Sequence, residues 1–193
     1  VTNLGDGLFG VGEVRLDKRA RTVSFPAAAN MERGMVEFLL CTLYGRTHEC
    51  VLRTEVEPFQ IHLAILLLNP RKGTNPPPSH LEAGSDGPTE RPYQKPIMGD
   101  PIEVELSWKH EGRDVRRRGE ELVANVKTGK PMSPGPWTYS GSFVRQGVFA
   151  AQIGGSVVSV IRDPGALVNN PREGSDDDEI WTVNTNAVPE INT

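Results

Sequence analysis

The sequence has only two cysteines, Cys41 and Cys50, and they do not form a Cys-x-x-Cys pair. This scarcity excludes a four-thiolate iron–sulfur cluster, a zinc ribbon and a thioredoxin-type redox motif. Long hydrophobic runs are also missing, because the longest one, residues 61–68, is interrupted by His62. A membrane-spanning helix needs about 20 apolar residues. We therefore expect no transmembrane segment in this chain.

The chain has no excess of positive charge: 21 Lys and Arg stand against 25 Asp and Glu, a formal net charge of -4. This balance argues against a nucleic-acid-binding surface and against binding to anionic membranes. Common catalytic signatures are missing too. No Gly-x-Ser-x-Gly nucleophile motif occurs. Residues 127–131 fail as a phosphate loop, because Ala124 stands where the first glycine belongs and Pro131 replaces the Ser or Thr.

The 193 residues fit one domain, and 20 Gly with 16 Pro favour strands and loops over a helical bundle. We predict a single α+β domain over residues 1–193 with a mostly antiparallel sheet. One buried helix is expected at about residues 58–68, followed by a Pro-rich loop over residues 69–101, the first place to look for a ligand or partner. Period-two alternation and turn signals predict hairpins at 11–16/22–25, 102–108/114–117 and 148–153/156–161, a short helix at 120–126 and a last strand at 180–183.

The two cysteines lie in β-prone runs separated by Gly45-Arg46, which predicts a tight hairpin. In that register Cys41 faces Cys50 at a non-hydrogen-bonded pair, where Cα atoms approach to about 4.5 Å, so a disulfide is available. Two buried free thiols are the alternative. A disulfide predicts an oxidising compartment, periplasmic or extracellular. The sequence begins at Val1 without Met, so a membrane anchor on a removed N-terminal segment stays open.

His48, Glu49 and His62 are the candidate metal ligands, because two imidazoles and a carboxylate suit a divalent ion that activates water. His48 is expected on the cysteine face of the hairpin, beneath the helix that carries His62. Glu49 points to the opposite face and needs a bulge to join them. The alternative is that both histidines satisfy structural hydrogen bonds.

Three aspartates and three tryptophans are further candidates. Asp176, Asp177 and Asp178 form an acidic run that could bind a cation such as calcium, although a solvated surface segment is the simpler interpretation. The tryptophans could stack on a sugar or belong to the core; they are Trp108, Trp137 and Trp181.

Several local patterns occur in order along the chain. They are Gly45-x-x-His48-Glu49, Ile61-His62-x-Ala64, Trp137-Thr-Tyr-x-Gly141-Ser142, Ala166-Leu-Val-Asn-Asn-Pro171 and Asp177-Asp-Glu-Ile-Trp181. Together they resemble the YdjY-like domain family. The resemblance implies a bacterial, often exported domain without an established activity. Some relatives are described as ferredoxin-like, but two cysteines cannot hold a four-thiolate cluster.

These features favour a non-catalytic, exported binding or accessory module over an enzyme. We expect no cofactor, and a partner that is an unknown protein or a small ligand. The alternative is a metal-dependent hydrolase that uses His48 and His62. A third hypothesis is an electron-transfer accessory protein whose partner carries the cofactor.

Overall fold

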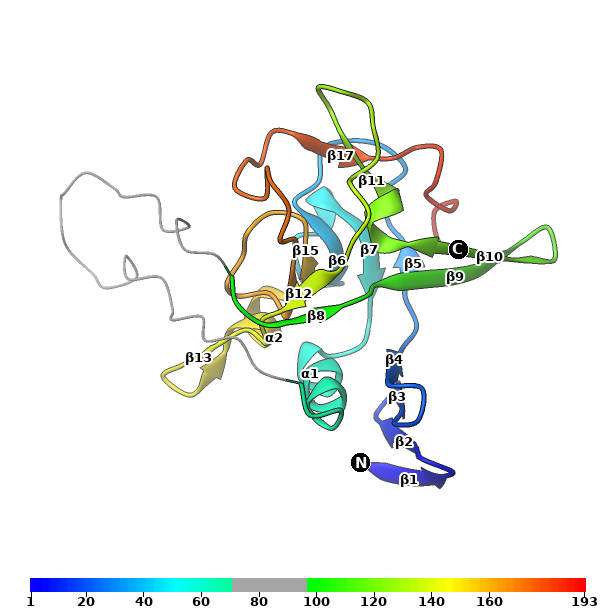
Figure 1. Cartoon of the computed structure of the whole chain (residues 1–193), viewed down its shortest axis with the longest axis vertical. Coiled ribbons are helices and arrows are strands. Elements are labelled where there is room, and N and C mark those ends of the chain that lie inside the picture. The colour runs from blue at the N-terminus through cyan, green and yellow to red at the C-terminus, as the bar shows by residue number, and fades with distance from the viewer. Residues whose placement is uncertain (71–96) are drawn as a thin grey trace.

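The first strands form a four-stranded antiparallel sheet at the N-terminal end of the chain (Figure 1). The structure is a computed structural model that describes residues 1–70 and 97–193. The strands are β1 Thr2–Gly5, β2 Leu8–Val11, β3 Val14–Asp17 and β4 Thr22–Ser24. Arg15 in β3 lies opposite Ser24 in β4, which confirms the first predicted hairpin.

A seven-stranded sheet forms the centre of the molecule, in the order β5-β7-β6-β15-β16-β12-β8 (Figure 1). Its strands are β5 Ala28–Ala29, β6 Phe38–Thr42, β7 Cys50–Thr54, β8 Asp100–Ile102, β12 Trp137–Tyr139, β15 Ser156–Ser159 and β16 Val168–Asn169. The pairs β6/β7 and β15/β16 are parallel and the other pairs are antiparallel.

Three two-stranded sheets complete the β structure of residues 1–70 and 97–193. They are β9 Glu105–His110 with β10 Arg113–Arg118, β11 Val123–Asn125 with β17 Trp181–Val183, and β13 Val144–Arg145 with β14 Val148–Phe149. The β9/β10 hairpin and the last strand are as predicted, and the hairpin projects from the body of the molecule (Figure 1). The whole is an α+β fold with mostly antiparallel strands, as predicted.

The predicted buried helix is α1, Pro58–Leu66. Proline at its first position fits the fixed φ that a helix start needs. Ile61, His62 and Ala64 are buried, and α1 packs against β2 and β3. Residues 71–96 of the predicted Pro-rich loop lie outside the described residues. No helix in the described part of the chain is both long and apolar enough to cross a membrane.

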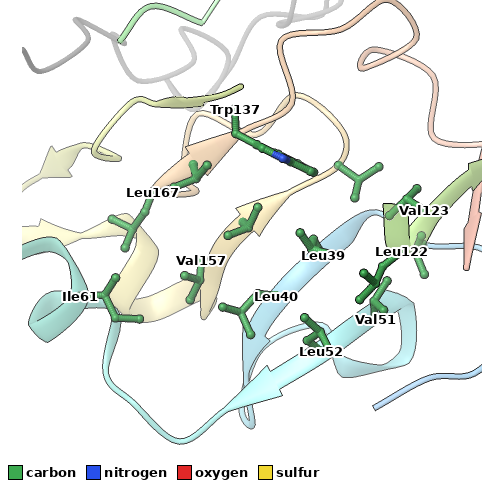
Figure 2. Packing of buried hydrophobic residues seen from close by; sticks show 14 of the residues in the cluster. Leu39, Leu40, Val51, Leu52, Ile61, Leu122, Val123, Trp137, Val157 and Leu167 are labelled. Carbon is green, nitrogen blue, oxygen red and sulfur yellow. The ribbon is translucent and has the colours of Figure 1, made fainter. Parts of the chain in front are cut away.

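The core lies on both faces of the central sheet, because consecutive residues of one strand, such as Leu39 and Leu40, point to opposite faces and are both buried (Figure 2). Large apolar side chains from strands far apart in sequence meet there and are almost fully buried. Among them are Leu39, Val51, Leu122, Trp137, Val157 and Leu167. Trp137 is fully buried, so it belongs to the core and offers no surface for a sugar.

The predicted cysteine hairpin is wrong. β6 and β7 run parallel, with Phe38 opposite Cys50 and Cys41 beside Arg53. All of β6 is buried and so is most of β7, and uninterrupted apolar runs buried on both faces are typical of parallel strands. Instead of a two-residue turn, residues 43–49 return the chain to the start of β6 through the 3-10 helix η1, Thr47–Glu49.

The predicted hairpin at Gly154-Gly155 is also wrong. Residues after β14 form a short helix, α2 Ala150–Gly154, which ends at Gly155 with a φ of 69°. Alanines and glutamine favour helix, and glycine reaches this left-handed conformation without strain. The predicted helix at 120–126 is a 3-10 helix, η3 Gly119–Leu122, that continues into β11.

Candidate functional site

His48 and Glu49 belong to an ion network at the surface around Arg46. Arg46 Nη1 lies 2.7 Å from Glu37 Oε2 and 3.3 Å from Glu49 Oε1. His48 Nε2 is 3.7 Å from Glu49 Oε1, and its side chain is 79% exposed. Burial and the neighbouring Glu49 raise the pKa of Glu37, and Arg46 opposes this shift. The arrangement holds η1 against the start of β6.

His62 occupies a different part of the molecule. It lies in α1, which follows the C-terminal end of β7, whereas His48 precedes the N-terminal end of β7. The predicted hairpin brought these two elements together, and the parallel register separates them. His62 Nδ1 is 2.9 Å from the hydroxyl of Tyr139, and the Phe149 ring centroid lies 4.9 Å from the imidazole. The structure therefore places His62 in a buried aromatic contact.

No group of three or more His, Cys, Asp and Glu that could hold a metal ion occurs among residues 1–70 and 97–193. Asp176 and Asp178 are exposed and Asp177 is partly exposed. One Asp177 oxygen accepts from the Glu179 backbone N–H at 3.0 Å, and the other lies 4.0 Å from Lys127 Nζ. A metal at either set of residues stays a prediction.

Cys41 and Cys50 are buried with Phe38 in a small cluster separate from the main core. Both are free thiols here, which is the alternative that the sequence left open. Their Sγ atoms lie 4.0 Å and 2.9 Å, respectively, from the carbonyl oxygen of Leu52. Burial and the adjacent Cys41 raise the pKa of the Cys50 thiol well above its ordinary value. The disulfide itself stays a prediction.

We expect neither thiol to react with an aromatic disulfide reagent in the folded protein, because both side chains are buried and the raised pKa of Cys50 leaves little of its thiolate. The exposed Ser133 offers a control, since Ser133→Cys should react with one equivalent under the same conditions. Rapid modification of Cys41 or Cys50 in the native protein would contradict the prediction.

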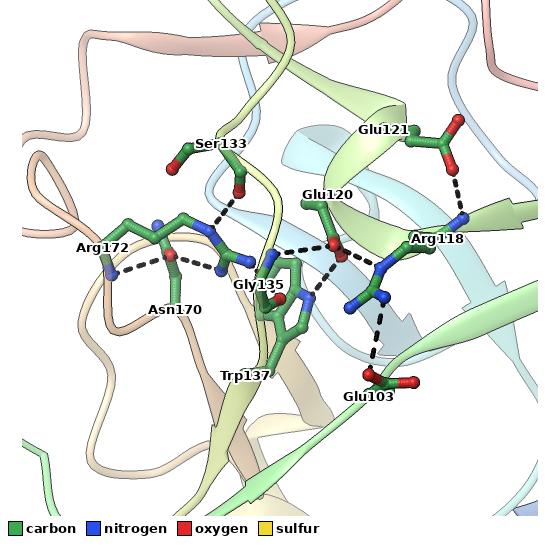
Figure 3. Close-up of polar contacts among 9 residues, drawn as sticks. All are labelled: Glu103, Arg118, Glu120, Glu121, Ser133, Gly135, Trp137, Asn170 and Arg172. Atoms are coloured by element: carbon green, nitrogen blue, oxygen red, sulfur yellow. Dashed lines mark hydrogen bonds and ion pairs between the residues drawn. The ribbon is translucent and has the colours of Figure 1, made fainter.

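A buried carboxylate that the sequence analysis did not single out, Glu120, is the centre of a polar network (Figure 3). The Glu120 side chain is 1% exposed. Its Oε1 accepts hydrogen bonds from Arg118 Nε at 2.6 Å and from the Gly135 backbone N–H at 3.2 Å. Its Oε2 accepts from the indole Nε1 of Trp137 at 3.2 Å. The network joins η3 to β12 and to the chain that precedes it.

Glu120 stays ionised despite its burial. Burial raises the pKa of a carboxyl group, but hydrogen bonds from its own backbone N–H, from Gly135, from Trp137 and from Arg118 outweigh this, so the pKa of Glu120 is lowered. All of these donors stabilise the carboxylate rather than leave it free for proton transfer. Glu120 is therefore a structural anion.

Arg172 extends the network on the other side of Trp137 (Figure 3). Its guanidinium lies 5.3 Å from the centroid of the Trp137 ring. Nε donates to the Ser133 carbonyl at 2.6 Å and Nη1 to Asn170 Oδ1 at 3.2 Å, and Nη2 donates to the Gly135 carbonyl. Burial lowers the pKa of Arg172. This cation therefore binds neutral oxygens and an aromatic face, and it fixes the loop before β12.

The sequence carried only a weak signal for this network. Glu120 and Glu121 are adjacent carboxylates in the segment that predicted a short helix, and nothing local distinguishes the buried one from the exposed one. Gly135 and Trp137 are distant in sequence, so their convergence on Glu120 depends on the sheet.

Comparisons with known proteins add one result. A family model described as the YdjY domain matches residues 14–193, from the start of β3 to the last residue. No curated protein and no solved structure matches the chain.

Proposed function

The chain belongs to the YdjY domain family, and from this premise we propose that it is a non-catalytic binding or accessory module that acts outside the cytoplasm. The observation that carries the proposal is that two buried titratable groups, Glu120 and His62, are engaged in internal contacts. The Glu120 carboxylate has three side-chain or backbone donors, and His62 contacts the Tyr139 hydroxyl. A catalytic acid or base must instead reach a substrate proton.

The alternative metal-dependent hydrolase makes a different prediction about purified protein. If the module is non-catalytic, elemental analysis should find no stoichiometric zinc, manganese, iron or nickel. Added metal should not promote hydrolysis of nitrophenyl acetate or nitrophenyl phosphate, and His48→Ala should behave as the parent, because the exposed His48 side chain would then hold no metal. Stoichiometric metal that is lost in His48→Ala or His62→Ala would overturn the proposal in favour of the hydrolase.

An extracytoplasmic location is supported by what the family resemblance implies and is tested by the state of the thiols. Protein recovered from its native compartment should be denatured without reductant and its free thiols counted. No reactive thiol indicates the Cys41–Cys50 disulfide and an oxidising compartment. Two reactive thiols per chain would show that the Cys41–Cys50 disulfide is absent, and the thiols would then give no support for export. Haem or iron–sulfur protein that copurifies would favour the electron-transfer accessory instead.

A further inference from the structure

The β9/β10 hairpin projects from the body of the molecule as a two-stranded sheet (Figure 1). Among the strands that the structure describes, β9 pairs with β10 alone, so the outer edge of each strand has no strand beside it. Such edges expose backbone N–H and C=O groups that another chain can bind. The hairpin is therefore a candidate interaction surface, and its charges indicate the partner.

One face of the hairpin is balanced by its own ion pairs. Side chains alternate between the two faces of a strand. Lys109 Nζ lies 3.2 Å from Asp114 Oδ1, and Arg116 Nη1 lies 3.4 Å from Glu105 Oε1. Arg118, the remaining cation of this face, belongs to the buried network of Figure 3. Each cation on this face thus has a carboxylate of its own.

The opposite face combines apolar side chains with cations. Its centre is the cross-strand pair of Trp108 and Val115, which are both partly exposed. Arg113 and Arg117 lie on either side of Val115 along β10. Arg113 has no hydrogen bond or ion pair within the described part of the chain. Arg117 Nε lies 3.7 Å from Glu121 Oε2, but the two side chains are 43% and 45% exposed. Exposed pairs of this kind are weak, so another carboxylate can compete.

The charge of the hairpin is opposite to that of the chain. Residues 105–118 contain five Lys and Arg against three Asp and Glu, whereas the whole chain has a net charge of -4. Of the three carboxylates, Glu105 and Asp114 are on the balanced face and Glu111 is in the turn. The face of Trp108 and Val115 therefore attracts an acidic partner.

The spacing of the two arginines favours an extended polypeptide as this partner. Residues in an antiparallel strand are about 3.4 Å apart, so the backbones of Arg113 and Arg117 are about 14 Å apart, with Val115 midway. An extended segment has the same repeat. It can place carboxylates at positions i and i+4 opposite the arginines and an apolar side chain at i+2 opposite Val115. Nucleic acids and lipid headgroups offer no apolar group held midway between two anions.

The outer edge of β10 can hydrogen-bond such a segment. In an antiparallel pair, alternate residues turn their backbone groups away from the partner strand. Two contacts identify these residues in β10: the Arg118 N–H donates to Glu121 Oε1 at 2.8 Å, and the Arg116 carbonyl accepts from Arg117 Nη1 at 3.0 Å. By the same alternation, the Asp114 backbone and the Arg116 N–H face outward, and neither has a backbone partner among the described residues.

A second copy of this chain does not suit this edge. Antiparallel pairing of β10 with its own copy would set one arginine run against the other, and like charges directly opposite destabilise a sheet. We propose that β10 binds an extended acidic segment of another protein by strand addition, with carboxylates at i and i+4 on Arg113 and Arg117. This inference rests on the proposed function, because it names the partner of the binding module. It is tested by peptide binding, whereas metal and thiol content test the proposed function.

Synthetic peptides added to the full chain provide the test, with binding followed by the fluorescence anisotropy of a labelled peptide. A peptide with the core Glu-Thr-Leu-Thr-Glu should bind saturably, and salt should weaken it. The core Gln-Thr-Leu-Thr-Gln should not bind measurably. The rearranged core Glu-Glu-Leu-Thr-Thr has the same charge but should bind about fivefold more weakly, because only one carboxylate can then reach an arginine of this face.

Backbone methylation of the peptide tests strand addition. In the expected register the two threonine N–H groups face β10 and the leucine N–H faces away. N-Methylation of both threonines should therefore abolish binding, and N-methylation of the leucine, the matched control, should leave it unchanged. Equal effects of the two modifications would overturn the proposal.

Protein variants assign the surface. Arg113→Glu should weaken the peptide about tenfold, because an attraction is replaced by a repulsion. Arg15→Glu changes the net charge equally at another exposed strand position and should bind as the parent does. If Arg113→Glu does not fold, Arg113→Gln should weaken binding in the same direction. Equal losses at Arg113 and Arg15, or binding to phosphatidylglycerol vesicles in place of the peptide, would overturn the proposal. If no peptide binds, the inference falls and the arginines only protect the edge from aggregation.

Discussion

Replacing Glu120 with alanine is expected to lower the free energy of unfolding by about 3 kcal/mol, measured by denaturant unfolding at neutral pH. The substitution leaves the buried indole N–H of Trp137 and the backbone N–H of Gly135 without their acceptor. It also removes the carboxylate 2.6 Å from Arg118 Nε. A buried donor without a partner costs more than the average hydrogen bond contributes.

Glu103→Ala is the matched control. Glu103 Oε1 lies 3.5 Å from Nη1 of the same arginine, but its side chain is 74% exposed. Exposed ion pairs contribute about 0–1 kcal/mol, so this variant should differ little from the parent. Equal effects of Glu120→Ala and Glu103→Ala would show that the buried network does not stabilise the fold.

The pH dependence of Glu120→Gln gives an independent measurement. Because the pKa of Glu120 is lowered in the folded protein, its carboxylate contributes stability above the unfolded pKa, about 4.3. That contribution disappears as the pH falls through the folded pKa. The stability difference between parent and Glu120→Gln should therefore be constant near pH 7 and shrink in acid.

Gly155→Ala is expected to lower the free energy of unfolding by about 3 kcal/mol or more, for two reasons that add. Gly155 has a φ of +69°, which L-residues rarely adopt, and an added Cβ would lie 2.3 Å from Thr42 Oγ1 and 2.8 Å from Gly45 Cα. The atoms that the added Cβ would meet at Gly45 belong to the backbone, which cannot move aside as a flexible side chain can. Thermal or denaturant unfolding measures the loss.

Gly129→Ala separates the two causes. Gly129 has a similar φ of +65°, but nothing lies within 4 Å of an added Cβ. Its cost should be that of the backbone conformation alone, about 1–2 kcal/mol. If both variants lose the same stability, the contact between the α2 end and Thr42 is not tightly packed.

Local patterns in the sequence predicted the elements that depend on neighbouring residues. Helix α1 begins at Pro58, as its start signal indicated, and the β9/β10 hairpin turns at Gly112, as the alternation indicated. The Gly45-Arg46 and Gly154-Gly155 patterns failed, because both are valid turn signals and only tertiary pairing decides between a hairpin and another connection. The parallel pairing of β6 with β7 and the packing of Gly45 on Gly155 are such long-range features.

The same limit applies to the candidate sites. The predicted hairpin register placed His48 near His62. The structure has β6 and β7 parallel, and this pairing places the two histidines beyond opposite ends of β7. The Glu120 network could not be found from spacing, because its partners come from chain segments that meet only in the folded sheet. The residue types in the sequence identify the side chains that can bind metal or carry charge, but they do not show which of these side chains become buried in the fold.

The order of strands in the central sheet has a consequence for synthesis on the ribosome. β6 pairs on one side with β7, which follows soon after it, and on the other with β15, which begins at Ser156. A nascent chain that has not yet reached Ser156 presents the edge of β6, a mostly apolar strand that is fully buried in the finished fold, with no neighbour. Such edges pair readily with other chains. Truncated forms that end before β15 should therefore aggregate or depend on chaperones.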